Sequence, residues 1–257
     1  MRVATIAIHT FKESVREKVL YNLVAFALLL IGAAILFGNI SVGIERIILI
    51  TLGLTSISVF GLLIAIFIGI GLVSKEIERR TIYNILSKPV SRVEFILGKY
   101  AGLLLTLCVN TAIMTGGFYV ALFYQKHSLN GEDVAFLGAV YFILLQLAIV
   151  VGIAVVFSCI STPVLSAVFT FCLYVIGNFS NDIQALGGES GSRVLGVCAN
   201  VLYYLLPNLG NFNIISRVAH GASIPAYLWI GNSLYALLYV TVLMSIAVLV
   251  FEEREFR

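Results

Sequence analysis

The chain alternates between long apolar stretches and short charged ones. A helix needs about 20 apolar residues to cross the hydrocarbon core of a bilayer. Five longer stretches contain no Asp, Glu, Lys or Arg: Val19–Ile44, Ile47–Ser74, Tyr100–Gln125, Val134–Asn181 and Val218–Phe251. The fourth has room for two helices, because Ser158–Pro163 interrupts it and Pro163 suits the first turn of a new helix.

This pattern predicts an all-α membrane protein with six transmembrane helices. We expect a single transmembrane domain over residues 1–257, with spans at about residues 20–38, 53–73, 100–124, 134–157, 163–181 and 226–250. Composition agrees, since 60% of residues are hydrophobic, 11% are charged and the mean hydropathy is +1.05. Soluble domains carry about 25% charged residues. A soluble globular protein, a disordered chain and a nucleic-acid binder are therefore excluded.

Charge in the loops predicts the orientation. An even number of spans places both termini on one side. Residues 1–18, 75–99 and 254–257, all on that side, hold twelve of the sixteen Lys and Arg residues. By the positive-inside rule, both termini are expected in the cytoplasm. Residues 1–18 also repeat apolar side chains at helical spacing, with Lys12 and Arg16 among the charged residues between them, which predicts an amphipathic helix on the cytoplasmic membrane surface.

The external stretch 182–225 is the longest segment between predicted spans. Gly187–Ser192 is typical of a flexible loop, and Val201–Leu206 and Phe212–Val218 are amphipathic enough for short helices on the outer membrane surface. The alternative, an extension of the sixth helix, is opposed by Pro207.

Charge is most concentrated between spans two and three. Residues 74–100 hold nine of the 29 charged residues. Glu76–Ser87 favours a short helix with apolar residues beside its charges, and Pro89 ends it. Ser91 and Glu94 then match a capping box at the start of the next helix. Positive-inside anchoring alone would explain the basic residues but not the glutamates. A mixed-charge helix with apolar residues is suited to docking on a soluble partner.

This loop resembles the cytoplasmic loop of type-2 ABC transporter permeases. The matching residues are Glu76, Glu78, Thr81, Leu86, Pro89, Ser91, Arg92, Gly98 and Lys99. Arg80 departs from the pattern, since many relatives carry glycine there. Within this family the chain is most similar to the permease subunit of copper-enzyme (nitrous oxide reductase) maturation systems. Tyr203–Asn208, in the external stretch, is a further point of resemblance.

The resemblance implies a membrane subunit that pairs with a second copy or a related permease and binds two cytoplasmic ATPase subunits. ATP and Mg would be bound by the ATPase, with no cofactor in this chain and no catalytic residues of its own. A periplasmic or accessory protein is a further expected partner, and the inner membrane of a prokaryote is the expected location. The resemblance assigns ATPase coupling to one set of residues: Glu76, Glu78, Arg79, Arg80, Thr81, Ile82, Leu86 and Pro89.

The predicted spans contain no Asp, Glu, Lys, Arg or His, so energy is expected to enter from outside the membrane. Asn110, Thr111, Gln146, Thr170, Asn178 and Asn232 are the polar residues noted in them, and we expect interhelical hydrogen bonds from these side chains. Gly61, Ala65 and Gly69 form a small-xxx-small ridge for close helix packing, within the subunit or across a dimer.

The function expected from these observations is a permease subunit of an ATP-driven ABC transporter, an exporter. Two alternatives stay open. One is the membrane component of an ATPase-driven assembly that transmits force or regulates. The other is a secondary carrier or intramembrane protease, for which Gly188–Gly191 and Glu252–Arg257 match short protease strings. The Gly188–Gly191 string lacks a histidine base nearby, since His220 is the next histidine. The Glu252–Arg257 string is typical of a charged cytoplasmic flank.

Overall fold

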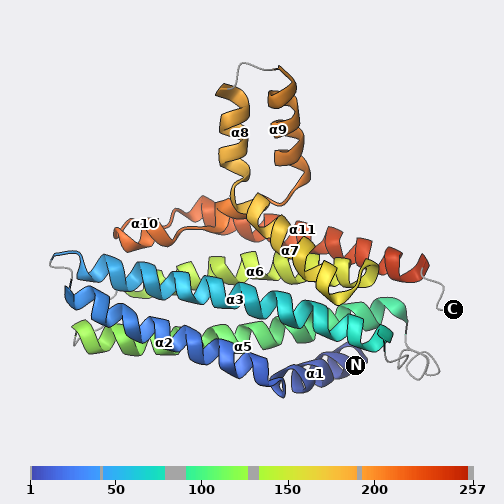
Figure 1. The fold of residues 1–257 in the computed structure, drawn as a ribbon, viewed down its shortest axis with the longest axis horizontal. Coiled ribbons are helices and arrows are strands. Elements are labelled where there is room, and N and C mark those ends of the chain that lie inside the picture. The colour runs from blue at the N-terminus through green and yellow to red at the C-terminus, as the bar shows by residue number, and fades with distance from the viewer. Residues whose placement is uncertain (1, 41–42, 79–90, 127–132, 190–192, 254–257) are drawn as a thin grey trace.

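The computed structural model describes residues 2–40, 43–78, 91–126, 133–189 and 193–253, and these residues form helices without any strand. Five long helices lie side by side along the long axis of the molecule (Figure 1). They are α2 (Lys18–Ile40), α3 (Glu45–Glu78), α5 (Arg92–Lys126), α6 (Val134–Ile160) and α11 (Ala226–Glu253). Each is long and apolar enough to cross a membrane.

The fifth predicted span is not one straight helix. Residues 163–181 were expected to form a single rod, but α7 (Pro163–Asn178) ends early and α8 (Ser180–Glu189) follows at a bend of 55°. The described residues therefore contain five candidate spans, or six if the bent pair counts as one. The predicted break before α7 is present, because α6 ends at Ile160 and Pro163 occupies the first turn of α7.

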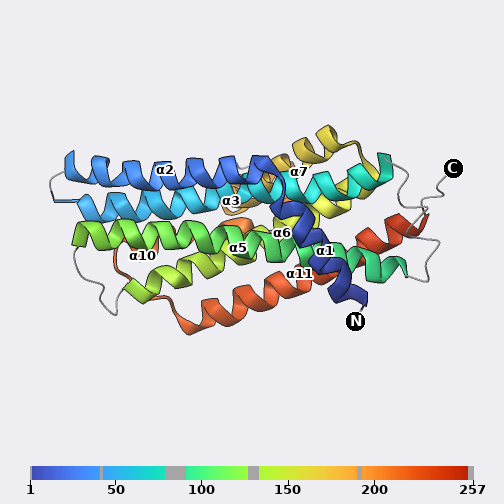
Figure 2. The same cartoon turned by 90° about the horizontal axis from the view of Figure 1, so that it is seen from below.

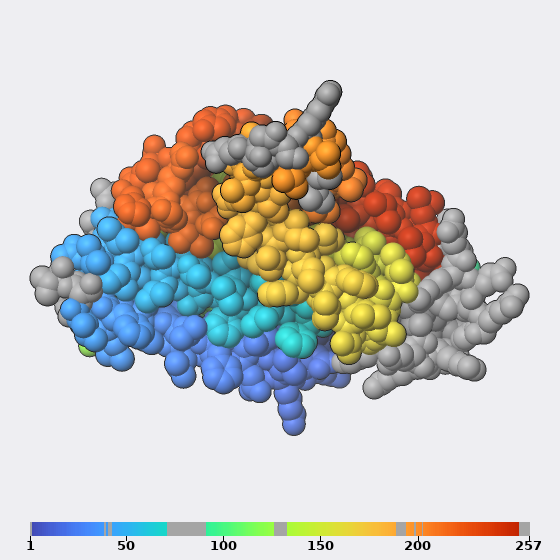
Figure 3. Space-filling model, turned by 45° about the horizontal axis from the view of Figure 1, so that its top comes forward, coloured from blue at the N-terminus to red at the C-terminus, as the bar shows by residue number. Residues whose placement is uncertain are grey.

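Helix α6 is the centre of the bundle. In its most apolar window 72% of the residues are buried, against 28% in α2 and 22% in α11, which lie at the periphery. The aromatic rings of Tyr141 on α6 and Trp229 on α11 stack at 5.3 Å, and the Tyr141 hydroxyl shares a 2.7 Å hydrogen bond with Ser233. In the space-filling view α7 lies across α3 (Figure 3).

The stretch between α7 and α11 differs from the expected flexible loop. α8 and α9 (Arg193–Leu205) form a helical hairpin that stands away from the bundle (Figure 1), followed by the 3₁₀ helix η2 (Leu209–Phe212) and α10 (Ile215–Ala219). The prediction of a loop was wrong for Gly187, Gly188 and Glu189, which lie in α8. A Cβ on Gly187 would overlap the Cβ of Ala199, so its missing side chain lets the two helices pack closely.

The N-terminal helix is present as α1 (Arg2–Val15). It crosses α5 near the end of the bundle where α3 finishes, and both ends of the described chain lie at that same end (Figure 2).

Candidate functional site

The predicted ATPase-coupling segment lies between the end of α3 and the start of α5. Arg79, Arg80, Thr81, Ile82, Leu86 and Pro89 fall outside the described residues, while Glu76 and Glu78 belong to the last turn of α3. The structure describes the chain again from Ser91, where α5 begins. The predicted capping box is confirmed: the Glu94 backbone N–H donates to Ser91 Oγ at 3.2 Å, and the Ser91 N–H donates to Glu94 Oε2 at 3.1 Å.

The first turns of α5 are joined to the end of α11. Arg92 Nη1 donates a 3.2 Å hydrogen bond to the backbone carbonyl of Phe251, and the rings of Phe95 and Phe251 stack at 5.8 Å. Phe95 and Phe251 are both buried. The start of α5 is therefore held against the end of α11 by a hydrogen bond and a ring contact.

Two glycines on the next turns of α5 seat α1. A Cβ on Gly98 would lie 2.8 Å from the Ile6 side chain, and one on Gly102 would lie 2.6 Å from the backbone carbonyl oxygen of Ala7. Thr10 completes this contact and is fully buried. The backbone of α1 thus rests on α5 where no larger residue fits.

A buried lysine between these glycines links the same two helices. Lys99 is only 3% exposed, and its Nζ lies 3.9 Å from a carboxylate oxygen of Glu13 on α1. The ammonium also lies 5.7 Å from the centre of the Phe95 ring, a cation–π distance. We call this junction of α1, α5 and α11 the α5 base. Sequence reasoning noted Gly98 and Lys99 as family markers but missed their partners on α1, although Gly98 and Gly102 have helical small-xxx-small spacing.

The ridge on α3 faces its own subunit. A Cβ on Gly61 would meet the Leu147 side chain at 2.5 Å, and one on Gly69 would meet the Cβ of Ala154 at 2.6 Å, both on α6. Ala65, between them, is fully buried. Sequence alone left open whether a helix of the same subunit or of a partner packs here, and in the structure α6 occupies the ridge.

The polar residues of the spans fall into three groups. Gln146 on α6 donates to Asn178 Oδ1 on α7 at 3.1 Å and to the carbonyl of Leu209 at 3.3 Å, so the expected interhelical bonds are confirmed there. In contrast, Asn110 and Thr170 donate to carbonyls one turn back in their own helices. Thr111 Oγ1 is buried without a hydrogen-bond partner.

Side-chain amides continue from Gln146 across the break after α7. Asn208 donates to Asn181 at 2.8 Å, Asn181 donates to Asn211 at 3.2 Å, and Asn232 on α11 donates to the Asn211 carbonyl at 3.0 Å. We call Gln146, Asn178, Asn181, Asn208, Asn211 and Asn232 the amide cluster. Because backbone groups at a helix break lose their helical partners, these amides bind the irregular chain to α6, α7 and α11.

The described residues hold no group of three or more His, Cys, Asp or Glu side chains that could bind a metal ion.

Comparison with known proteins identifies the family. The family model described as "ABC-2 family transporter protein" matches residues 4–256, nearly the whole chain. A search among curated proteins gave no match. The match spans nearly all of α1 and every other described helix, so the chain belongs to the ABC-2 family of transporter membrane proteins.

Proposed function

We propose that this chain is the permease subunit of an ATP-driven ABC exporter. Permeases of its family are generally not catalytic themselves, normally work with a cytoplasmic ATPase and dimerise. Two such subunits, identical or related, would each bind one ATPase subunit, and ATP and Mg would be bound by the ATPase. Both termini and residues 79–90 would lie in the cytoplasm of a prokaryote, on the side that carries most Lys and Arg residues.

The observation that carries this proposal is the α5 base. Residues 79–90 lead within two residues into Arg92, whose side chain binds α11, and within four helical turns into the glycines that seat α1. A partner that pulls or pushes on residues 79–90 would move three helices together. This is the property that a coupling segment between an ATPase and a membrane bundle requires.

The finer subgroup is also a proposal. We infer a role in maturation of a copper enzyme, with a periplasmic accessory partner, from the resemblance in residues 74–100 and in Tyr203–Asn208. Genes for an ATPase and a copper enzyme beside the gene for this chain would support it.

Disrupting the coupling segment tests the ATPase partnership. We expect an Ile82→Ala/Leu86→Ala double variant to lose copurification with the ATPase or to uncouple ATP hydrolysis from transport. Truncating buried apolar anchors at an interface often costs about 2 kcal/mol or more. Lys75→Ala is the control and should have a milder effect, because it lies nearer the membrane. Wild-type copurification and hydrolysis in the double variant would contradict the proposal.

A further inference from the structure

The bend between α7 and α8 is not fixed by the local sequence. Sharp kinks in helices usually lie at a proline, whose ring removes a backbone N–H, and residues 164–206 contain none. Helical hydrogen bonds are present on both sides of the bend. The Phe179 N–H donates to the Val175 carbonyl at 3.2 Å, and the Ile183 N–H donates to the Phe179 carbonyl at 2.9 Å. One continuous helix across the bend is therefore available to this sequence.

Contacts with a distant part of the chain accompany the bend. A Cβ on Gly177 would lie 2.6 Å from the carbonyl oxygen of Pro207 and 3.0 Å from the Leu209 side chain, so the returning chain lies directly against the end of α7. The Ser180 hydroxyl donates to the Gly177 carbonyl at 3.0 Å. In a continuous helix that carbonyl would accept from the Asn181 N–H instead.

Asn181, in the first turn of α8, connects this helix to the returning chain. It accepts a 2.8 Å hydrogen bond from Asn208 and donates one of 3.2 Å to Asn211. Both partners are held on α11, because the Asn208 N–H donates to the Tyr235 hydroxyl and Asn232 donates to the Asn211 carbonyl. We call the two hydrogen bonds of Asn181 the latch.

The latched arrangement leaves one polar atom unsatisfied. Asn208 is 4% exposed, and its Oδ1 has no hydrogen-bond partner among the described residues. A buried acceptor without a donor costs free energy. This cost lowers the stability of the latched state relative to a state in which the Asn208 side chain turns to another partner.

The α8–α9 hairpin, which we call the arm, is built to move as one body. Its two helices pack mainly on each other and stand away from the bundle (Figure 1). Gln184 on α8 donates a 3.1 Å hydrogen bond to Asn200 on α9. At the second foot of the arm, the Tyr239 hydroxyl of α11 donates to the carbonyl of Leu205 at 3.1 Å, which provides a pivot.

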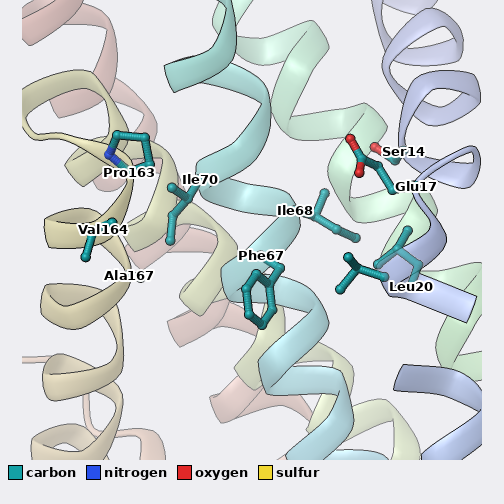
Figure 4. A pocket seen from close by; sticks show the side chains of 10 residues that line it. Ser14, Glu17, Leu20, Phe67, Ile68, Ile70, Pro163, Val164 and Ala167 are labelled. Carbon is teal, nitrogen blue, oxygen red and sulfur yellow. The ribbon is translucent and has the colours of Figure 1, made fainter. Parts of the chain in front are cut away.

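The start of α7 is anchored on one side and borders a hollow on the other. Ser166 Oγ donates a 2.9 Å hydrogen bond to the Phe157 carbonyl of α6. Pro163 and Val164 face α3, where Ile70 lies, across an apolar hollow of about 410 Å³ (Figure 4). The hollow leaves α7 space to change its tilt about the anchored start.

We propose that the arm swings about the bend at Phe179, between the latched angle of 55° and a straight α7–α8 helix, and that the latch sets the balance between the two. In the latched state α7 is a short helix with the arm beside it, and in the straight state α7 and α8 form one long helix. A straightened α8 continues α7 towards the end of the bundle where α2 finishes (Figure 1). This motion is a property of the chain itself and does not depend on ATP-driven transport.

Distances between pairs of spin labels, measured by double electron–electron resonance, test the swing. The full chain is reconstituted in lipid nanodiscs, in a background without native cysteines and diluted with unlabelled protein. One label replaces Val194 near the far end of the arm, 71% exposed, and the other replaces Phe37 on α2, 57% exposed. The 10 residues of α8 rise about 15 Å, so removing a bend of 55° moves its far end by about 14 Å.

Breaking the latch should populate the straight state. In Asn181→Ala we expect a new, major population in which the Val194–Phe37 distance is shorter than in the wild type by about 5–10 Å, within the reach of a 15 Å lever. Gln184→Ala is the matched control, because it removes an amide of the same helix whose bond stays inside the arm, and it should keep the wild-type distance. Equal distances in Asn181→Ala and the wild type, or an equal shift in both variants, would refute the latch.

A second variant reaches the bend from α7. Gly177→Ala brings a methyl group against the Pro207 carbonyl and should shift the Val194–Phe37 distance in the same direction. Gly188→Ala, with nothing within 4 Å of the added Cβ, should not. Labels at Leu186 and Val201, one on each helix of the arm, should keep one distance in every variant. A lengthening of that distance together with the shift would show that the arm comes apart, which contradicts a swing.

Discussion

The α5 base and the amide cluster perform the same task with different chemistry. Each attaches a short part of the chain to the long helices. The α5 base uses glycine contacts and a charged pair, Lys99 with Glu13. The amide cluster uses neutral side chains, with Gln146 at its centre. Lys99 and Gln146 are both 3% exposed, so burial alone does not explain the choice.

Distance from water explains why one region uses charged groups and the other uses neutral amides. Lys99 lies near the end of the bundle, where its partner Glu13 is 41% exposed and solvent stabilises the charge. Gln146 lies in the middle of α6, at the depth where a charged side chain is most costly. Amides satisfy broken backbone there without a net charge. In this fold, the polar side chains that attach short segments are therefore charged near the end of the bundle and neutral deeper in it.

The largest effect is expected at the glycine contact. Gly102→Ala brings a methyl group against the Ala7 carbonyl of α1, and such overpacking costs about 1–3 kcal/mol. For a chain of this size each kcal/mol shifts the Tm by about 2–4 °C. Thermal unfolding in detergent measures the loss, and faster thiol labelling of Ser14→Cys, otherwise 2% exposed, reports the displacement of α1.

Gly116→Ala on the same helix is the control. Nothing lies within 4 Å of the added Cβ, so helix propensity should leave stability equal or raise it by about 0.5–1 kcal/mol. Equal destabilisation by both variants would mean that α1 does not rest on Gly102.

A smaller effect is expected in the amide cluster. Gln146→Leu removes the donor to Asn178 and to the Leu209 carbonyl, and membrane hydrogen bonds are worth about 0.6–1.7 kcal/mol. Asn110→Leu is the matched control, because Asn110 bonds only its own helix among the bonds described, and it should be close to neutral. Thermal unfolding of both variants measures the difference, and a greater loss in Asn110→Leu would reverse the comparison.

The smallest effect is expected for the charged pair. Glu13→Gln removes the charge of a partly exposed side chain but keeps an amide oxygen that can accept from Lys99, so we expect a loss of about 1 kcal/mol or less. The Tm difference from the wild type should shrink as salt rises, because salt screens exposed charges. A salt-independent loss above that of Gly102→Ala would show that the pair, and not the glycine contact, holds α1.

Local signals in the sequence predicted the features that depend on neighbouring residues. The apolar stretches predicted the long helices, and Ser91 with Glu94 predicted the start of α5, because a capping box is formed within one turn. Long-range contacts were not predictable in this way. Gly187 and Gly188 suggested a loop, but contact with Ala199 and the hydrogen bond from Gln184 to Asn200 hold the segment in a helical hairpin. The sequence around Asn178 and Asn181 did not predict the break between α7 and α8. The hydrogen-bond partners of these residues are distant in sequence and lie on α6, on η2 and just before η2.

The early end of α7 leaves this helix shorter than the five long ones. Its 16 residues rise about 24 Å, against about 30 Å for the hydrocarbon core. This is a hydrophobic mismatch, which a bilayer accommodates by thinning or a protein by supplying polar groups at the short end. The asparagines after Asn178 supply such groups. A polar solute moving beside α7 would therefore meet a shorter apolar path than beside any of the five long helices.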